Sequence, residues 1–293
     1  MLLLLGHKHL YNLDTELLHS FISNALAEDV GDGDHTSLAT IPRGTQGKAK
    51  LLVKDEGVIA GVELALLIFK EVDPQLKVDV LIQDGADVKP KDIVLWVEGD
   101  AQSILKAERL VLNCMQRMSG IATKTRQIVD LLEGTNTKVL DTRKTTPGMR
   151  YLEKWAVRIG GGVNHRFGLY DMILIKDNHV DYSGGIRNAI ENTLQYLAEN
   201  NKKLAVEIEV RNLDELEQVL ATGGVNRILL DNFNYADLKQ AVNIIEGRYI
   251  TEASGGITVD TVRDFANCGV DYVSLGELTH SVKSLDLSLK AAY

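Results

Sequence analysis

The chain has 293 residues, enough for one large or two ordinary domains with a sizeable core. Its 45% hydrophobic and 25% charged residues are typical of a soluble globular protein, and its formal net charge of −9 argues against binding to nucleic acids or anionic membranes. It has two cysteines, a leucine run at 2–5 too short for a signal peptide, and no apolar span of membrane length, so we expect a cytoplasmic protein without disulfide bonds.

The first part of the chain indicates a mixed α+β domain whose strands pair locally. A helical pattern begins at Asp14 or Thr15, either of which could cap it, and a second helix is expected over 63–72. Strands are expected within 48–60, 76–83 and 92–99.

An acidic loop at 28–37 follows the first helix. Its carboxylates would suit calcium, but the ligand spacing and the closing glutamate of an EF-hand are absent. Turn and helix-cap chemistry from Gly, Asp and Ser is the preferred interpretation.

A strong helical pattern opens at Ser103 and is expected to stop at Gly120. Its apolar stripe, which is typical of core packing, consists of Ile104, Ala107, Val111, Cys114 and Met118. The polar residues off this stripe are available to another surface, including that of a partner chain; they are Glu108, Arg109, Asn113, Gln116 and Arg117.

From about residue 120 the chain repeats a strand followed by a helix. Apolar runs are centred near 139, 173, 207, 229, 250 and 273, and the last four are about 22 residues apart, enough for one strand, one helix and short loops. Helical patterns fill the gaps at 186–199, 213–221, 235–246 and 259–268. This alternation predicts a parallel sheet with helices outside it, and the limited length favours a reduced or open α/β barrel.

The segment 140–179 is basic within an acidic chain. It holds seven Lys or Arg and two His against four acids, a balance of +3 without the histidines, which indicates a small and highly anionic ligand. In LDTRK and in ILIKDNH, charged residues directly follow an apolar run. In barrel enzymes, catalytic residues stand in this way just after the carboxyl ends of buried parallel strands. GGGVNHR between them would let the backbone approach a ligand. Solvated loops are the alternative, but surface charge does not usually recur at strand ends.

Polar residues follow every apolar run of the repeating part. In chain order they are Asp141, Arg143, Lys144, Lys176, Glu209, Asp231, Glu252, Ser254, Ser274 and Gly276. If the runs are neighbouring parallel strands, these groups face one mouth. Glu209 and Asp231 are hard oxygen ligands that suit Mg²⁺ or sugar hydroxyls. Glu207 lies two residues before Glu209, points to the same face of the expected strand and could take its place. Salt bridges to Arg143 or Lys176 are the alternative role for the carboxylate pair.

The sequence SGGIT at 254–258 places a glycine turn before an expected helix start, which indicates a phosphate-binding site. Arg143 and Arg166 suit carboxylates, which a guanidinium binds in bidentate fashion, whereas Lys144 and Lys176 suit phosphate as point charges. Together these features predict an enzyme that brings a phosphorylated sugar to a second anion.

At these residues the chain resembles the quinolinate phosphoribosyltransferase family, the decarboxylating nicotinate-nucleotide pyrophosphorylases. The matching stretches run along nearly the whole chain in order and are GDHTS at 33–37, ERLVLNCMQRMSGIAT at 108–123, DTRKTTPGMR at 141–150, KWAVRIGGGVNHRFGLYDMILIKDNH at 154–179, VEIEV at 206–210, LLDN at 229–232, EASGGI at 252–257 and VSLGELTHS at 273–281. No charged site position departs from the family pattern.

The resemblance implies an α/β fold with an N-terminal α+β sandwich at 1–118, an open seven-stranded α/β barrel at 119–278 and a segment at 279–293 that returns to the first domain. It also implies a homodimer, or a higher oligomer. The implied reaction transfers phosphoribosyl from phosphoribosyl pyrophosphate to quinolinate with Mg²⁺, giving nicotinate mononucleotide, pyrophosphate and CO₂ for NAD biosynthesis.

By position, the resemblance also implies the site residues. Quinolinate would be held by Arg143, Lys144, His165 and Arg166, with Arg109 arriving from the other subunit. Phosphates would be held by Lys144, Lys176, Ser254, Gly255, Gly256 and Gly276. Glu209 and Asp231 would hold the ribose and the metal, directly or through substrate phosphates, and with Lys144 they are the expected catalytic residues. Thr142 and Ser274 are further expected substrate contacts. His165 is expected to donate a hydrogen bond rather than shuttle a proton.

Three alternatives remain open at this point. A Schiff-base aldolase would use Lys176 at a barrel strand end. A relative of the same family could transfer phosphoribosyl to another base without decarboxylation. A phosphate-ligand sensor without enzyme activity is disfavoured by the paired carboxylates.

Overall fold

The computed structural model describes residues 15–292, which fold into two compact units. The first unit takes the chain up to Thr123, then 151–159 and the residues from Lys283; the second takes 124–150 and 160–282. The proposed cap at Asp14 and the leucine run at 2–5 lie outside the described residues. Within 15–292, no helix is both long and apolar enough to cross a membrane.

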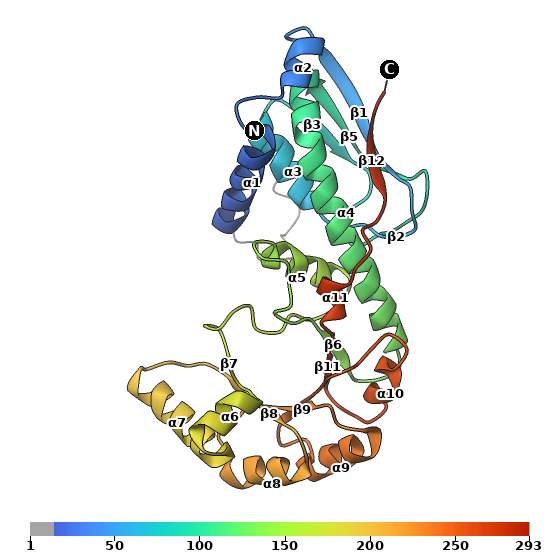
Figure 1. Ribbon diagram of the computed structural model, residues 1–293. Helices are drawn as coiled ribbons and strands as arrows, with labels where there is room; N and C mark the ends of the chain where they lie inside the picture. Colours follow the sequence, from blue (N-terminus) through green and yellow to red (C-terminus); the bar gives the residue numbers. More distant parts are fainter. Residues whose placement is uncertain (1–14, 293) are drawn as a thin grey trace, which may run out of the picture. The chain divides into compact units, whose positions relative to one another are not determined.

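The first unit is built on a four-stranded antiparallel sheet in the order β12-β1-β5-β3 (Figure 1). Its strands are β1 (Gln46–Val53), β3 (Lys77–Val80), β5 (Ile93–Asp100) and β12 (Leu287–Ala291). A separate pair joins β2 (Gly57–Val58) to β4 (Asp87–Val88). Alternate residues of β1 are buried, as expected for a sheet with one face towards the core. The three strands predicted for this part are confirmed.

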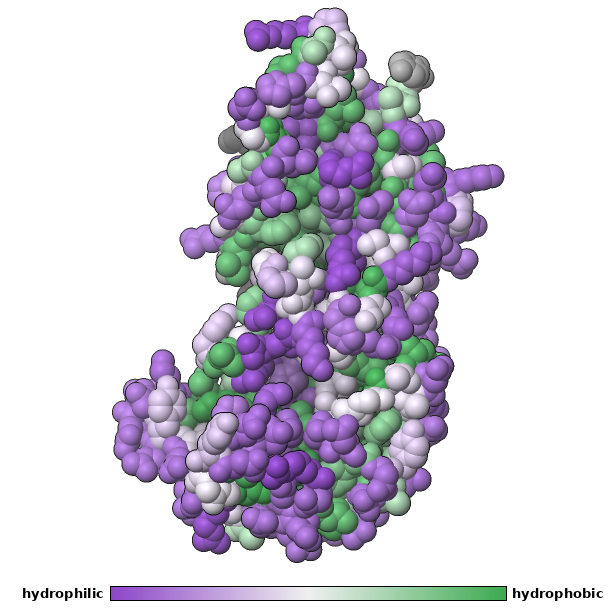
Figure 2. All heavy atoms as spheres, in the orientation of Figure 1, coloured by the Kyte–Doolittle hydropathy of each residue, from purple (hydrophilic) through white to green (hydrophobic). Residues whose placement is uncertain are grey.

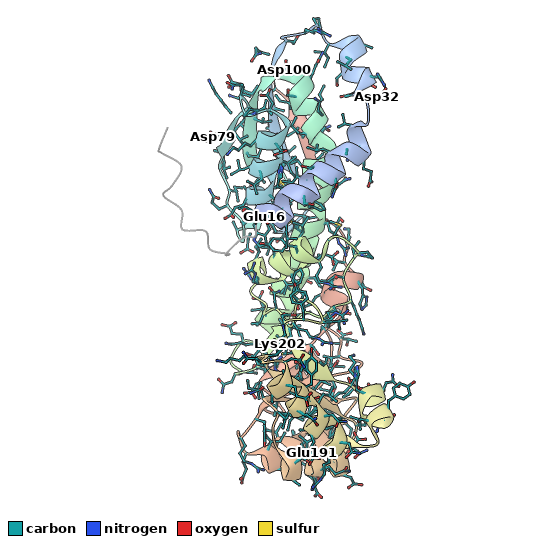
Figure 3. The ribbon with its side chains drawn as sticks, turned by 90° about the vertical axis from the view of Figure 1, so that its left-hand side faces the viewer. Glu16, Asp32, Asp79, Asp100, Glu191 and Lys202 are labelled. Atoms are coloured by element: carbon teal, nitrogen blue, oxygen red, sulfur yellow. The ribbon has the colours of Figure 1, made fainter. Side chains whose placement is uncertain are left out.

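The helices of the first part of the chain are α1 (Thr15–Val30), α2 (His35–Thr40), α3 (Val62–Val72), α4 (Ala101–Leu131) and α5 (Arg150–Ile159). Asp34 caps α2, because its side chain accepts a hydrogen bond from the Ser37 N–H at 3.0 Å. This confirms the turn-and-cap interpretation of the acidic loop. Many carboxylates of this unit point outward, among them Glu16, Asp32 and Asp79 (Figure 3).

Helix α4 is longer than expected, so the predicted stop at Gly120 is wrong. Gly120 is buried, and the helix continues to Leu131 through the buried Ile121 and Ile128. Continued burial at helical spacing outweighs the roughly 1 kcal/mol that a glycine costs inside a helix. The predicted apolar stripe from Ile104 to Met118 is confirmed as buried.

Two polar residues of α4 have partners within their own unit. Arg117 Nη2 lies 2.8 Å from Oε1 of the buried Glu153, and Gln116 donates to the backbone oxygen of Leu287 at 2.9 Å. These two side chains therefore already have partners within this chain, and the expectation of a contact with a partner chain stays a prediction.

The second unit contains a six-stranded parallel sheet in the order β6-β11-β10-β9-β8-β7. The strands are β6 (Lys138–Leu140), β7 (Ile173–Ile175), β8 (Val206–Val210), β9 (Arg227–Asp231), β10 (Ile250–Ser254) and β11 (Tyr272–Ser274). Val163 adds a parallel bridge to Leu140 and marks a seventh position beside β6. This is the open α/β barrel that the sequence predicts.

Helices that connect successive strands lie outside the sheet (Figure 1). They are α6 (Asp177–Ser183), α7 (Ile186–Glu199), α8 (Leu213–Thr222), α9 (Tyr235–Ile245) and α10 (Val262–Ala266), whereas α11 (Glu277–His280) follows β11, the last strand of this sheet along the chain. Hydrophilic side chains cover most of the surface of α6 to α9 on the face drawn in Figure 2, as helices with one buried face require. The carboxyl ends of all six strands meet at one edge of the sheet.

Candidate active site

A cavity of about 810 Å³ opens at the carboxyl ends of the barrel strands. Thirteen of the predicted site residues line it, namely Thr142, Arg143, Lys144, His165, Arg166, Lys176, Glu209, Asp231, Ser254, Gly255, Gly256, Ser274 and Gly276. Each follows a strand, the Val163 bridge or a neighbouring turn, because parallel strands deliver their ends to the same mouth. The expectation that these groups come together is met by the structure.

The cationic side of the cavity contains Arg143, Lys144 and Arg166. Burial, and then the nearby Arg143 guanidinium, lowers the pKa of Arg166 from its ordinary value, so these cations repel one another. An anionic ligand would relieve that repulsion. The Lys144 backbone is fixed on both sides, because its N–H donates to Thr142 Oγ1 at 3.0 Å and its oxygen accepts from the buried Thr279 hydroxyl at 2.8 Å.

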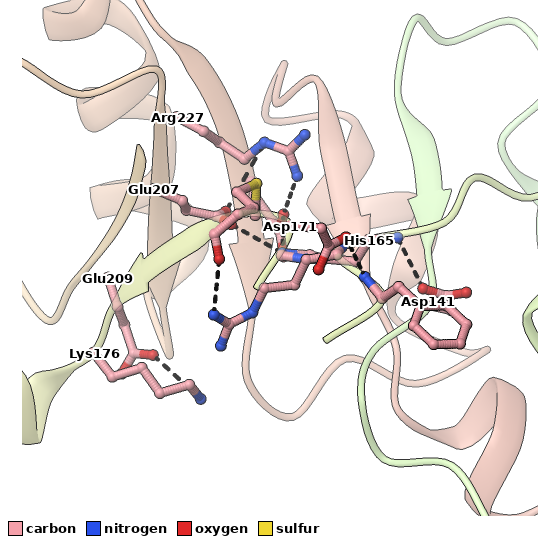
Figure 4. A network of polar contacts seen from close by, with 11 residues as sticks. Asp141, His165, Asp171, Lys176, Glu207, Glu209 and Arg227 are labelled. Carbon is pink, nitrogen blue, oxygen red and sulfur yellow. Dashed lines mark hydrogen bonds and ion pairs between the residues drawn. The ribbon is translucent and has the colours of Figure 1, made fainter. Parts of the chain in front are cut away.

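Asp141 does not face the mouth, contrary to expectation. It is completely buried and is not among the lining residues. Its two oxygens accept from the His165 N–H at 2.8 Å and from Asn164 Nδ2 at 2.6 Å (Figure 4). Asp141 thereby holds the 163–166 segment against the end of β6.

The carboxylate pair stands at the ends of the adjacent strands β8 and β9. Burial raises the pKa of Glu209, and the neighbouring Asp231 carboxylate raises it further. Burial also raises the pKa of Asp231, against the opposing effect of a hydrogen bond from Asn232 Nδ2 at 2.6 Å. Lys176 Nζ lies 3.9 Å from Glu209 Oε2, so the salt-bridge alternative is confirmed for this residue, and the role of the pair in binding ribose or metal stays a prediction.

The glycine turn after β10 is present, but its connection to a helix is not as expected. Gly255 and Gly256 have φ values of +93° and +63°, and α10 begins only at Val262. A phosphate site here would therefore use backbone N–H groups of the turn, since the helix start is too far along the chain. Gly255 also lies directly against Asn232, where a Cβ would come within 2.9 Å of the backbone nitrogen.

A largely buried polar cluster, which includes the cavity-lining residues His165 and Glu252, adjoins the cavity (Figure 4). His165 Nε2 is 2.9 Å from Glu207 Oε2 and 3.5 Å from Glu252 Oε2, and Arg227 Nη1 is 3.0 Å from the same Glu252 oxygen. Glu207 is fully buried and does not line the cavity, so it does not substitute for Glu209. Glu207, Glu252 and His165 have ligand atoms within 4.8 Å of one another, a spacing that suits a metal. The Arg227 guanidinium lies beside both carboxylates and offsets part of their charge, so we interpret the cluster as an ion-pair network.

Sequence analysis missed several lining residues. They include Asn232, Thr258, Glu277 and His280. His280 and Glu277 belong to α11, whose four residues carry no helical periodicity that a sequence pattern could reveal. Arg109 is exposed on α4 in the first unit, so its predicted part in the site stays a prediction.

The fold and the cavity define an α/β-barrel enzyme for anionic substrates, and comparison with known proteins gives its family. The family model for the quinolinate phosphoribosyl transferase N-terminal domain matches residues 34–119, and that for the C-terminal domain matches 121–290. Quinolinate phosphoribosyltransferase [decarboxylating] 2b of Nicotiana tabacum is 47% identical, over 91% of this chain and 80% of its own length. The probable nicotinate-nucleotide pyrophosphorylase [carboxylating] of Bacillus subtilis is 40% identical, over 93% and 92%.

Solved structures agree. NadC from Streptococcus pyogenes aligns with a TM-score of 0.90 at 39% identity, covering 97% of this chain and 99% of that one. The nicotinate-nucleotide pyrophosphorylase from Francisella tularensis aligns with a TM-score of 0.89 at 36% identity, covering 98% and 100%. The chain belongs to the quinolinate phosphoribosyltransferase family. The predicted family, fold and enzyme class, a pentosyltransferase of NAD biosynthesis, are thereby confirmed.

Proposed function

We propose that the barrel cavity binds quinolinate and phosphoribosyl pyrophosphate side by side and joins them with loss of CO₂. The observation that carries this proposal is the meeting of cations and a carboxylate pair, from separate strand ends, in one cavity of about 810 Å³. Two highly anionic substrates repel each other in water, and clustered cations offset that repulsion.

The cavity groups divide by chemistry between the two substrates. Arg143 and Arg166, with Lys144 beside them, bind the two carboxylates of quinolinate, since planar guanidinium groups form paired hydrogen bonds to carboxylates. Lys176 and the turn at 254–256 bind phosphate, as point charge and as backbone N–H donors. Glu209 and Asp231 accept hydrogen bonds from the ribose hydroxyls. Thr142, Ser274 and Gly276 line the same space.

Positioning and electrostatics carry the reaction. The bond between ribose C1 and the pyrophosphate oxygen breaks, pyrophosphate leaves with that electron pair, and the ring nitrogen forms the new bond to C1. The nitrogen is then positively charged, so it stabilises the carbanion left when the adjacent carboxylate departs as CO₂. A proton from solvent completes the ring. No side chain is required as a general base in this sequence, and the cations hold the anionic groups in line throughout.

The carboxylate pair also fits the expected Mg²⁺. The Asp231 carboxylate raises the pKa of Glu209, after burial, and a divalent cation would relieve that repulsion. Mg²⁺ commonly takes one or two carboxylates and completes its shell with water and substrate phosphates. When bound, it would neutralise charge on the pyrophosphate. Glu209 and Asp231 are the residues proposed to hold it.

The direct test is incubation of the protein with quinolinate, phosphoribosyl pyrophosphate and Mg²⁺, scoring nicotinate mononucleotide and CO₂. Nicotinate replaces quinolinate in a parallel reaction. Equal kcat/KM for both acceptors would contradict the decarboxylating assignment, because the second carboxylate would then have no binding partner. Borohydride trapping with substrate tests the aldolase alternative; covalent labelling of Lys176, which is half exposed, would support it.

The division of roles is tested at the carboxylate pair. Glu209→Ala and Asp231→Ala should each raise the KM for phosphoribosyl pyrophosphate and weaken the Mg²⁺ requirement, with the KM for quinolinate nearly unchanged. Ser254→Ala provides a comparison within the phosphate site. A loss confined to quinolinate would reverse the assignment.

We also propose a homodimer in which Arg109 acts on the partner's site. Its support is the exposure of Arg109 off the buried stripe of α4 and the self-complementary surfaces of a two-fold dimer. Mixing inactive Arg109→Ala and Lys144→Ala proteins would give mixed dimers with one site carrying both changes and one carrying neither. About a quarter of all sites should then recover. Activity that stays at the level of the single variants after verified subunit exchange would refute the proposal.

A cytoplasmic location remains our proposal for this chain, and it rests on composition. Some relatives, such as the enzyme from Nicotiana tabacum, are named as mitochondrial. Localisation of a fluorescent fusion of the whole chain is the test.

A further inference from the structure

Both ring nitrogens of His165 lie close to other groups of the protein. The Arg166 backbone N–H donates to Nδ1 at 2.7 Å, so Nδ1 carries no proton. Nε2 therefore carries the ring proton, and it faces the carboxylates of Glu207 at 2.9 Å and Glu252 at 3.5 Å. The His165 side chain is only 7% exposed.

Charged side chains from three adjacent strands lie next to this ring or support its neighbours. Glu207 of β8 lies opposite Arg227 of β9 in the parallel register, and Glu252 extends from β10. Arg227 Nε is 4.0 Å from Glu207 Oε1, and its guanidinium lies 4.9 Å from the Tyr272 ring on β11. The guanidinium is thus fixed between carboxylates and an aromatic face, which leaves the Glu207 carboxylate in a defined position under the imidazole.

The His165 ring also contacts the backbone of Arg166, the residue whose side chain reaches into the cavity. Arg166 is held at two points, by its own N–H, which donates to His165 Nδ1, and by Nη1, which donates to the Met172 backbone oxygen at 3.2 Å. Asp171 closes the turn between these points by accepting the Phe167 N–H at 2.6 Å. Arg166 then lines the cavity with Arg143.

We infer that Glu207 is a positioning residue for the acceptor end of the site: it orients the His165 ring, and through that ring it sets the position of the Arg166 guanidinium. His165 in this arrangement serves Arg166 and donates nothing to the substrate. That differs from the direct contact with quinolinate implied by the resemblance. The inference rests on the proposed use of Arg166 for a quinolinate carboxylate.

Two substitutions separate positioning from general structural support. Glu207→Leu removes the carboxylate under the ring and should raise the KM for quinolinate about tenfold, leaving the KM for phosphoribosyl pyrophosphate within about twofold. Glu207→Gln keeps a polar side chain of the same size next to the ring, so it should give a KM close to that of the unchanged protein. An equal rise in both KM values, or no rise in Glu207→Leu, overturns the inference.

A double-mutant cycle shows whether the effect passes through Arg166. In an Arg166→Ala background, Glu207→Leu should add less than about twofold to the KM for quinolinate. A full tenfold effect in that background would mean that Glu207 acts by another route. If the unchanged chain forms no nicotinate mononucleotide, the proposed function is wrong. If the reaction proceeds but the effects of the two substitutions are additive, only the positioning role of Glu207 is wrong.

The role of His165 also has a spectroscopic readout that is measured on the unchanged protein. The chain has seven histidines, and loss of one signal in His165→Asn assigns this ring in long-range ¹H–¹⁵N spectra of histidine-labelled protein. We expect an unprotonated Nδ1 and a protonated Nε2, both before and after saturation with quinolinate. A ring that gains a proton or changes tautomer with quinolinate would show direct action on the substrate.

Discussion

Adjacent glycines in the turn after β10 allow a matched test of how tightly the phosphate site is built. Both have left-handed backbone, with φ of +93° at Gly255 and +63° at Gly256. A Cβ on Gly255 would lie 2.6 Å from Cγ and 2.9 Å from the backbone nitrogen of Asn232, whereas a Cβ on Gly256 would have nothing within 4 Å. Gly255→Ala and Gly256→Ala therefore share the backbone penalty and differ in steric conflict.

The expected magnitudes follow from these contacts. The left-handed conformation costs an alanine about 1–2 kcal/mol at either position. Only Gly255→Ala adds overpacking against fixed backbone, roughly 1–3 kcal/mol more. We expect the free energy of unfolding to fall by about 2–5 kcal/mol for Gly255→Ala and about 1–2 kcal/mol for Gly256→Ala.

Urea denaturation of the two variants beside the unchanged protein measures the difference, and steady-state kinetics measures its effect on the site. Gly255→Ala should also raise the KM for phosphoribosyl pyrophosphate more than Gly256→Ala, because displacement of Asn232 disturbs the carboxylate of Asp231 that it contacts. A Gly256→Ala variant as destabilised as Gly255→Ala would refute the steric reasoning.

Three further predictions concern other parts of the molecule. Burial, with the Glu207 carboxylate, raises the pKa of Glu252 to about 7 from 4.5, so the folded state binds this proton more tightly than the unfolded chain does. The smaller effects of His165, Ser274 and Arg227 lower this pKa but do not cancel the rise. The stability that Glu252 contributes, on the order of 3 kcal/mol, is therefore present below about pH 4.5 and is lost as the pH rises to about 7. Glu252→Gln should flatten that slope in urea unfolding at pH 5 and pH 7.5, and an unchanged slope would contradict the assignment. In the first unit, Arg117→Met removes the ion pair of 2.8 Å with the buried Glu153 and should cost about 3 kcal/mol by thermal unfolding, with partial recovery in Arg117→Met/Glu153→Gln. A loss below about 1 kcal/mol would show that this ion pair is dispensable. Asn232→Gly keeps the left-handed backbone at φ +56° but loses the hydrogen bond to Asp231, so the KM for phosphoribosyl pyrophosphate should rise several-fold at nearly constant stability. Asn232→Ala should lower the free energy of unfolding by about 1 kcal/mol more than Asn232→Gly does. Identical stability of these two variants would argue against the backbone effect.

The sequence predicted the barrel and the contents of its mouth because both depend on local patterns. Apolar runs that end in charge define strands, and their regular spacing defines the βα unit, so Lys176, Glu209 and Asp231 could be placed at one edge without knowing any contact. The direction of the first side chain after a short strand is not encoded in that way. Asp141 and Arg143 both follow β6, and only the observed backbone shows that Asp141 turns inwards.

Features that join distant segments were not predictable in the same sense. The contact of His165 with Glu207 and Glu252 depends on the order of β8, β9 and β10 and on a register that brings Glu207 opposite Arg227. The alternation of residues along each strand does not show which residues of neighbouring strands lie opposite each other. The continuation of α4 through Gly120 is similar, since glycine is a helix breaker by propensity and burial alone reverses that preference.

The sheet of the first unit has a consequence for the order in which the chain is made. β1 is an inner strand only because β12 pairs along it, from Val53 opposite Leu287 to Ala49 opposite Ala291. A ribosome releases the whole barrel sequence between these two strands, so during synthesis the nascent first unit presents an open β1 edge for most of the elongation time. Unpaired edges invite association with other chains. Translation speed and chaperone supply should therefore govern soluble yield of this protein more strongly than they govern that of a barrel whose sheet closes in chain order.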